Sequence, residues 1–198
     1  AELMKLADAY GFESGLLYWQ TSRGTEIRHH DFPKSAEIKP NLMAFVKPME
    51  MCSRKKYFKL ITTPDLRHHM EKAFAAGCDE VVFHRDGRVT ECAANNVSIL
   101  KDGVFRTAPT DNLILPGISR KHLIIHCKEL GVPVDETAFQ VEDLFTADEV
   151  IVSGSGEICS IATEIDGKPV GGKARELVEK IQETVYKEFE DYINTIND

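Results

Sequence analysis

Residues 80–107 read E-V-V-F-H-R-D-G-R-V-T-E-C-A-A-N-N-V-S-I-L-K-D-G-V-F-R-T, and they hold the clearest structural signal in the chain. Asp86-Gly87 and Asp102-Gly103 each separate two β-rich runs. An Asp-Gly pair in that position indicates a two-residue hairpin turn, because both turn residues need a positive φ. Asp166-Gly167 repeats the pattern further along. Three hairpins predict a largely antiparallel sheet.

Helices interrupt these strands. Leu123, Cys127 and Leu130 form an apolar stripe that ends at Gly131, which predicts a helix over Ser119–Leu130. The elements expected after it are a short helix at Val141–Ala147, a buried strand at Glu149–Val152 and a long amphipathic helix at Ala174–Ile193. The fold class predicted is α+β.

The first fifty residues have a different pattern and predict a separate unit. A helix over Ala1–Tyr10 stops at Gly11, and β-formers at Gly15–Gln20 lead through a turn into Glu26–His30, which together predict a hairpin. A strand at Leu42–Val46 precedes Pro48 and the basic residues 54–56, and another strand begins at Tyr57–Ile61. We therefore expect two domains, residues 1–50 and 51–198.

Composition narrows the function classes. The chain has 198 residues, 42% hydrophobic and 28% charged, which is typical of a folded domain and not of a disordered one. Its 24 Lys+Arg against 32 Asp+Glu give a net charge of −8, which disfavours nucleic acid as a partner. No apolar run approaches the roughly twenty residues that span a bilayer, and residues 1–20 do not read as a secretion signal. We expect a soluble cytoplasmic protein.

The cysteines and histidines predict neither a disulfide framework nor a metal site. Five scattered cysteines include no C-x-x-C pair, which favours reduced thiols. His68-His69 has no further ligand at a recognisable spacing, so no metal is predicted.

Two segments offer charges that suit a small anionic ligand. Strand alternation places Arg28 and His30 on one face, where they can grip a carboxylate; a solvated strand edge is the alternative. Glu91 follows a strand and precedes small residues, so it is either a buried anion that needs a partner or an ordinary surface glutamate.

Two further segments could bind phosphate. Leu115–Arg120 leads through a Pro-Gly turn into the N-terminus of the Ser119 helix, with a serine hydroxyl, which is either an anion site or a helix N-cap with no ligand. Ser153–Gly156 is a Gly/Ser loop after a strand, which is either a phosphate cradle or an ordinary turn.

Taken together, these segments resemble the class IV (fold type IV) pyridoxal-phosphate aminotransferases, most closely the D-amino-acid aminotransferases. The similarity covers residues 12–190. The motifs that carry it are S-R-G-T-E-I-R-H-H-D-F-P at 22–33, I-T-T-P-D-L-R at 61–67, A-G-C-D-E-V-V-F-H-R-D-G-R-V-T-E at 76–91, L-P-G-I-S-R at 115–120 and V-I-V-S-G-S-G-E at 150–157.

The resemblance implies a fold, an assembly and a reaction. Members have a small N-terminal α/β domain and a larger barrel-like domain, hold pyridoxal 5'-phosphate between them, and usually form homodimers. The implied reaction exchanges the amino group of a D-amino acid with a 2-oxo acid. Residues 1–50 would then be a remnant of the smaller domain.

The resemblance also implies residue roles. Glu91 would pair with the pyridine nitrogen and keep it protonated, so that the ring can accept electrons from the substrate Cα. Ile118, Ser119 and Ser155 would hold the phosphate, and Leu115 would lie against the ring. The substrate α-carboxylate would bind Arg28 and His30, a pair that favours the D-amino-acid branch over branched-chain aminotransferases and aminodeoxychorismate lyases.

One family feature is missing from the sequence. The Schiff-base lysine is expected after Ile61–Arg67, but only His68–Phe74 separates Arg67 from Ala75, too few residues for its motif and the helix that follows. Lys72 lies in this junction but reads as a solvated helix side chain, so no catalytic lysine is identified. Three explanations stay open: residues lost from the sequence, a designed deletion, or a natural degenerate copy. The alternative function is therefore an inactive scaffold that binds pyridoxal phosphate weakly at most.

Overall fold

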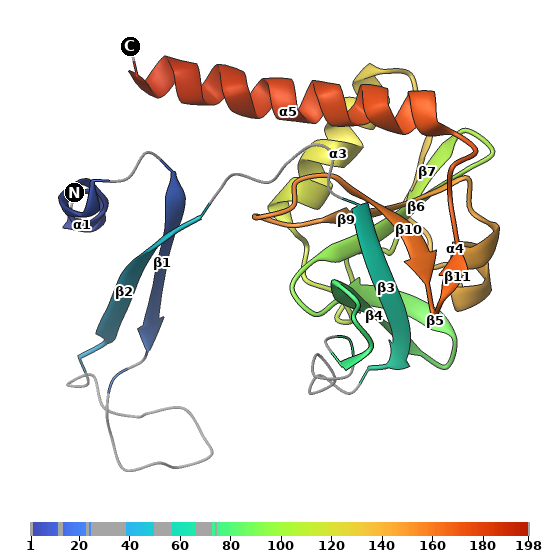
Figure 1. Ribbon diagram of the computed structural model, residues 1–198, viewed down its shortest axis with the longest axis horizontal. Helices are drawn as coiled ribbons and strands as arrows, with labels where there is room; N and C mark the ends of the chain where they lie inside the picture. The colour runs from blue at the N-terminus through green and yellow to red at the C-terminus, as the bar shows by residue number, and fades with distance from the viewer. Residues whose placement is uncertain are drawn as a thin grey trace. The chain divides into compact units, whose positions relative to one another are not determined.

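A computed structural model describes residues 2–11, 14–22, 24, 39–49, 57–65, 73 and 75–197. The chain separates into two compact units, Ala1–Met51 and Cys52–Asp198, which we describe individually (Figure 1).

The described residues of the first unit form one helix and a two-stranded antiparallel ribbon. Its elements are α1 (Glu2–Tyr10), β1 (Gly15–Ser22) and β2 (Asn41–Pro48). Gly11 ends α1 with a φ of 65°, as the sequence predicts. The partner of β1 is β2, with Gly15 opposite Pro48 and Ser22 opposite Asn41. The expected hairpin partner, Glu26–His30, lies outside the described residues.

The second unit is built on a nine-stranded mixed sheet. The strand order is β5-β4-β3-β10-β9-β6-β7-β8, with β11 added to β10. Three pairs, β10 with β3, β3 with β4 and β7 with β8, are parallel, and the other pairs are antiparallel, so the prediction of a largely antiparallel sheet is confirmed. The strands are β3 (Tyr57–Pro64), β4 (Glu80–Arg85), β5 (Arg88–Cys92), β6 (Asn96–Lys101), β7 (Val104–Thr107), β8 (Val134–Asp135), β9 (Glu149–Ser153), β10 (Ser160–Ile165) and β11 (Lys168–Pro169).

All three Asp-Gly pairs form the predicted turns. They join β4 to β5, β6 to β7 and β10 to β11. Asp86, Asp102 and Asp166 have φ values of 49°, 53° and 50°, and the glycine after each is also in the left-handed region. That geometry matches the right-handed twist of the paired strands, which explains why Asp-Gly occurs there.

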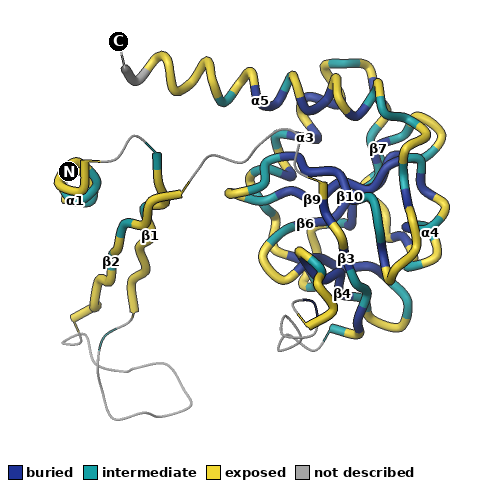
Figure 2. The backbone as a smooth tube through the Cα atoms, in the orientation of Figure 1, coloured by how far each residue is buried: buried dark blue, intermediate teal, exposed yellow. Residues whose placement is uncertain are grey.

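The helices with described bounds in this unit are α3 (Ile118–Glu129), α4 (Val141–Thr146) and α5 (Arg175–Asn197). They cover both faces of the sheet. Neighbouring strand residues alternate between two apolar clusters: Val150 and Val152 of β9 pack with Leu144 of α4, whereas Ile151 packs with Leu123 of α3 and the apolar face of α5. Figure 2 shows this core in dark blue beneath α5, whose C-terminal part is exposed.

The predicted helix stop at Gly131 is confirmed. Gly131 has a φ of 74°, its N–H bonds to the Lys128 carbonyl, and the Val132 N–H bonds to the Cys127 carbonyl. Such bonds satisfy carbonyls that the end of a helix leaves without partners.

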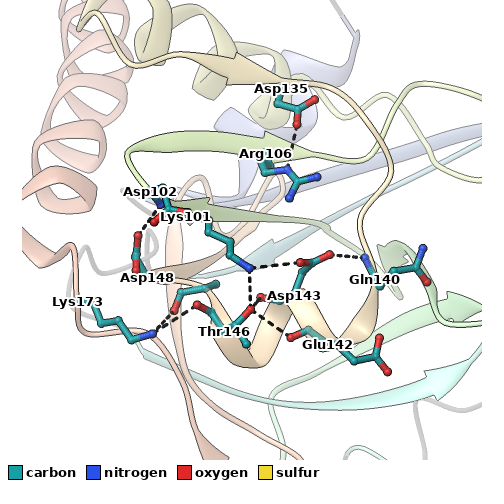
Figure 3. Close-up of polar contacts among 11 residues, drawn as sticks. Lys101, Asp102, Arg106, Asp135, Gln140, Glu142, Asp143, Thr146, Asp148 and Lys173 are labelled. Atoms are coloured by element: carbon teal, nitrogen blue, oxygen red, sulfur yellow. Dashed lines mark hydrogen bonds and ion pairs between the residues drawn. The ribbon is translucent and has the colours of Figure 1, made fainter.

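Polar contacts fix both ends of α4 (Figure 3). The Asp143 carboxylate accepts a hydrogen bond of 2.9 Å from the Gln140 N–H at the start of the helix. Lys101 Nζ lies 3.4 Å from Asp143 and 2.9 Å from Thr146 Oγ1. At the C-terminal end, Lys173 Nζ donates to the Thr146 carbonyl, where a cation suits the helix dipole. These contacts tie α4 to the β6–β7 turn and to the segment before α5.

The mixed α+β architecture confirms the predicted fold class, and the sheet curls into a half barrel (Figure 1). Among the described residues, none of the helices combines the length and the apolarity that a bilayer crossing needs.

Candidate functional site

Glu91, near the end of β5, is buried, with 7% of its surface exposed. Its Oε2 accepts a hydrogen bond of 2.7 Å from the Leu115 backbone N–H. The surface-glutamate interpretation is therefore wrong. The bond also links the end of β5 to the loop that begins at Leu115, so two of the predicted site residues contact each other.

A second buried glutamate shapes the turn that follows Glu91. Glu80 accepts hydrogen bonds from the Ala93 and Ala94 N–H groups at 3.3 and 3.4 Å and from Asn95 Nδ2 at 2.7 Å. Backbone N–H groups and an amide are suitable partners for a buried carboxylate. Glu80 thereby positions the β5–β6 turn and, with it, Asn95.

Asn95 and its neighbour Asn96 each pack against one of the two candidate phosphate loops. Asn96 Nδ2 donates a bond of 2.9 Å to the Leu115 carbonyl. A Cβ at Gly117 would overlap Asn96 Oδ1, and a Cβ at Gly154 would overlap Asn95 Oδ1. Both positions therefore need glycine because of close approach, and both loops are held against the same turn.

The N-terminus of α3 has no side-chain cap. Gly117 occupies the N-cap position. The Ser119 hydroxyl instead donates a bond of 2.9 Å to the Gly154 carbonyl, which joins the two loops directly. Within the described part of the chain no side-chain cap bonds to the start of α3, and backbone N–H groups without such a cap are suited to binding anions.

A cavity of about 520 Å³ opens at this helix end. Three of the predicted phosphate residues line it, namely Ile118, Ser119 and Ser155, together with Val185, Phe189 and other residues of α5. The Ser155 hydroxyl and the backbone N–H groups at the start of α3 can donate hydrogen bonds, and α5 adds apolar side chains, so the cavity fits a small molecule with an anionic end. Leu115 and Ile118 are 71% and 76% exposed.

Several predicted residues lie outside the described part of the chain: Arg28, His30 and the junction residue Lys72. Among the described residues that line the cavity, none is a lysine.

Sequence reasoning missed one cluster, of which His122 and Glu188 line the same cavity. His122 and His126 stand four residues apart on α3, and Glu188 faces them from α5. Glu188 Oε2 lies 2.7 Å from His122 Nδ1 and 2.8 Å from His126 Nε2. The i, i+4 spacing of the histidines was available in the sequence, but the third member is brought in only by the α3–α5 packing.

The charges of this cluster reinforce one another. Burial acts to lower the pKa of His126, but hydrogen bonds to Glu188 and Glu129 outweigh it, so the pKa lies above its ordinary value. The hydrogen bond from His126 lowers the pKa of Glu188. Near neutral pH the cluster therefore holds an ionised carboxylate against a histidine that binds its proton more tightly than usual.

Comparison with known proteins shows the family. The model of the family described as amino-transferase class IV matches residues 1–165, and the chain belongs to that family. Among its relatives, D-alanine aminotransferase of Staphylococcus haemolyticus is 33% identical over 207 residues, which cover 96% of this chain and 72% of the relative. The enzyme of the same name from Listeria monocytogenes serotype 4b is 34% identical over 210 residues, with the same coverage.

Solved structures confirm the fold. Branched-chain amino acid aminotransferase of Escherichia coli superposes with a TM-score of 0.81 at 21% identity, over 94% of this chain and 69% of that one. A putative 4-amino-4-deoxychorismate lyase from Legionella pneumophila gives a TM-score of 0.80 at 20% identity, over 94% and 74%. The predicted resemblance to class IV aminotransferases is thus confirmed.

Proposed function

We propose that this chain binds pyridoxal 5'-phosphate and that the protein transfers an amino group between a D-amino acid and a 2-oxo acid. The observation that carries the cofactor part is the cavity at the uncapped N-terminus of α3, where Ile118, Ser119 and Ser155 converge. The substrate part rests on the similarity to D-alanine aminotransferases.

The phosphate would bind at this helix end. The N–H groups of Ile118 and Ser119 donate along the helix axis, where the dipole favours a negative charge. The Ser155 side chain is exposed and can add a hydroxyl donor. Because the Ser119 hydroxyl is bonded to Gly154, it holds the two loops together while its backbone N–H stays available.

Glu91 and Leu115 would contact the ring. When bound, pyridoxal phosphate supplies an electron-accepting ring that stabilises negative charge at the substrate Cα. Glu91 would hold a proton on the ring nitrogen, and its bond to the Leu115 N–H keeps the carboxylate in place for this. The exposed Leu115 side chain offers an apolar surface for a ring face.

Arg28 and His30 remain the proposed ligands of the substrate carboxylate, on the strength of the sequence motif. We also propose that the protein forms a homodimer. We place it in the cytoplasm, since all four described cysteines are free thiols, as expected in a reducing compartment.

The second candidate, a scaffold without turnover, is favoured by one observation. Only residues 68–74 separate the 61–67 motif from Ala75, and none of the described cavity residues is a lysine. A lysine amine is the group that would move the proton at the substrate Cα.

One experiment separates the two candidates. The full chain is mixed with pyridoxal phosphate, its visible absorption is recorded, and the sample is reduced with borohydride before the modified lysine is mapped. Activity is then measured with D-alanine and a 2-oxo acid, with L-alanine as the matched control. A labelled lysine and D-alanine-dependent turnover support the enzyme. An unchanged spectrum, from a chain whose intact mass matches the 198 residues, supports the scaffold.

The phosphate assignment has its own test. We expect Ser155→Ala to weaken pyridoxal phosphate binding by about tenfold, because it removes a hydrogen bond to a charged group. Ser22→Ala, an exposed serine of the other unit, is the matched control and should leave binding unchanged. Equal affinities for the parent and Ser155→Ala would exclude the hydroxyl from the phosphate site.

A further inference from the structure

The cluster of His122, His126 and Glu188 has the composition of a metal site. It offers two imidazole nitrogens and a carboxylate oxygen, and these ligand atoms all lie within 4.8 Å of one another. Zinc is commonly bound by two histidines and one carboxylate, and two histidines at i and i+4 present their rings on one helix face. The third ligand comes from a separate helix, so the ion would bridge α3 and α5.

The surroundings of His126 provide an independent argument. Its Nε2 faces Glu188, whereas its other ring nitrogen, Nδ1, lies 2.8 Å from Glu129 Oε2. Metal-binding histidines almost always donate their second N–H to a carboxylate or carbonyl, which fixes the tautomer and orients the ring. The His126 side chain is also only 9% exposed, so its orientation is held by packing.

The distances suit replacement of protons by a metal ion. Glu188 Oε2 lies within hydrogen-bond distance of His122 Nδ1 and His126 Nε2. A tetrahedral ion with ligands at about 2.0–2.1 Å needs these atoms a few tenths of an ångström further apart. Glu188 is 44% exposed on α5 and can make that adjustment by side-chain rotation.

We propose that His122, His126 and Glu188 bind one Zn²⁺ ion, with Glu129 as the outer carboxylate that positions His126. The ion would take the place of the hydrogen bonds between the two rings and Glu188. Three protein ligands leave a fourth position for water or an anion. The proposed ligands differ from the residues proposed to hold pyridoxal phosphate, although His122 and Glu188 line the same cavity.

The test measures zinc binding alone. The full chain is freed of metal with a chelator and titrated with zinc chloride by calorimetry, without pyridoxal phosphate, whose phosphate also binds metal ions. We expect one Zn²⁺ per chain. Glu188→Gln should weaken the affinity by more than about tenfold, because losing a ligand costs at least as much as losing an outer-shell partner. Glu129→Gln should weaken it by about 10–100-fold while all three ligands remain.

Two controls complete the design. Glu183→Gln removes the same charge from an exposed position on α5 and should leave zinc affinity unchanged. His122→Gln is a second ligand variant at a partly exposed side chain, so it tests the site without disturbing the core.

Three results would overturn the proposal. They are a parent chain that does not bind Zn²⁺, equal affinities for the parent and Glu188→Gln, and a Co²⁺ complex whose spectrum shows thiolate ligation. The last result would assign the metal to cysteine.

Discussion

The Asp143 side chain stabilises the start of α4. Its carboxylate accepts the Gln140 N–H at the beginning of α4, and Lys101 faces it from the end of β6. The Gln140 hydrogen bond is the main reason why the pKa of Asp143 lies below its ordinary value; burial opposes it and Lys101 adds to it. Because ionisation is easier in the folded state, this carboxylate stabilises the fold when it is charged.

The lowered pKa of Asp143 predicts how the stability of the fold changes with pH. A lowered folded pKa gives a contribution that is complete above the ordinary Asp pKa of about 3.9 and is lost as the pH falls through the lower folded value. We expect Asp143→Ala to reduce the free energy of unfolding by about 1 kcal/mol at pH 7, a typical value for loss of a helix cap. The difference from the parent should shrink below about pH 4. Urea unfolding at several pH values measures it, with the exposed Glu142→Ala as control. A difference that stays constant with pH would contradict the assignment.

At the scale of elements, α5 depends on a buried carboxylate at its N-terminus. Glu149 is fully buried on β9, and its Oε1 accepts the Gly172 and Ala174 N–H groups at 3.0 and 3.1 Å. Arg175 lies 3.6 Å from its Oε2. One side chain thus joins the central sheet to the helix that forms one wall of the cavity.

The second prediction concerns the contacts between Glu149 and the start of α5. Glu149→Ala leaves two backbone donors without their acceptor and a cation without its partner, so the free energy of unfolding should fall by about 3 kcal/mol. Glu149→Gln keeps an acceptor oxygen, so its free energy of unfolding should fall by less than that of Glu149→Ala. Denaturant unfolding measures both, and Glu176→Ala, an exposed residue of the first turn of α5, is the control. A loss no larger than that of the control would show that Glu149 does not hold α5.

Local signals explain which elements the sequence can predict. Each Asp-Gly turn is specified by two adjacent residues, and Gly131 ends α3 through bonds within five residues, so these features are readable without the fold. The β1–β2 ribbon pairs residues separated by up to 33 positions, which periodicity does not reveal.

In the candidate site, too, the sequence predicts local features but not long-range contacts. Motifs indicate Glu91 and Ser119, but the contacts that hold them, from the Leu115 N–H to Glu91 and from the Ser119 hydroxyl to the Gly154 carbonyl, depend on long-range packing. A buried glutamate that organises a turn looks, in sequence, like any strand residue. The α3–α5 histidine cluster was missed for the same reason.

At the scale of the whole molecule, the first unit, considered by itself, has large apolar side chains at its surface. Trp19 and Leu42 are 56% and 61% exposed, and others on β1 and β2 are also exposed. Apolar surface of this kind is commonly buried by association.

We therefore predict that the chain self-associates, in line with the proposed homodimer. Light scattering coupled to gel filtration should give a mass at least twice that of one chain. Trp19→Ser combined with Leu42→Ser should shift the population toward monomer if these side chains lie in the interface. A monomeric parent would contradict the prediction.

Asn95 packs against Gly154 and Asn96 packs against Gly117, so the β5–β6 connection must keep its length. The two asparagines are adjacent and contact different loops. Inserting or deleting one residue before them would therefore move both side chains away from their glycines. Related sequences should then tolerate altered composition in this turn more readily than altered length, and a change at either glycine should require a smaller residue at the matching asparagine.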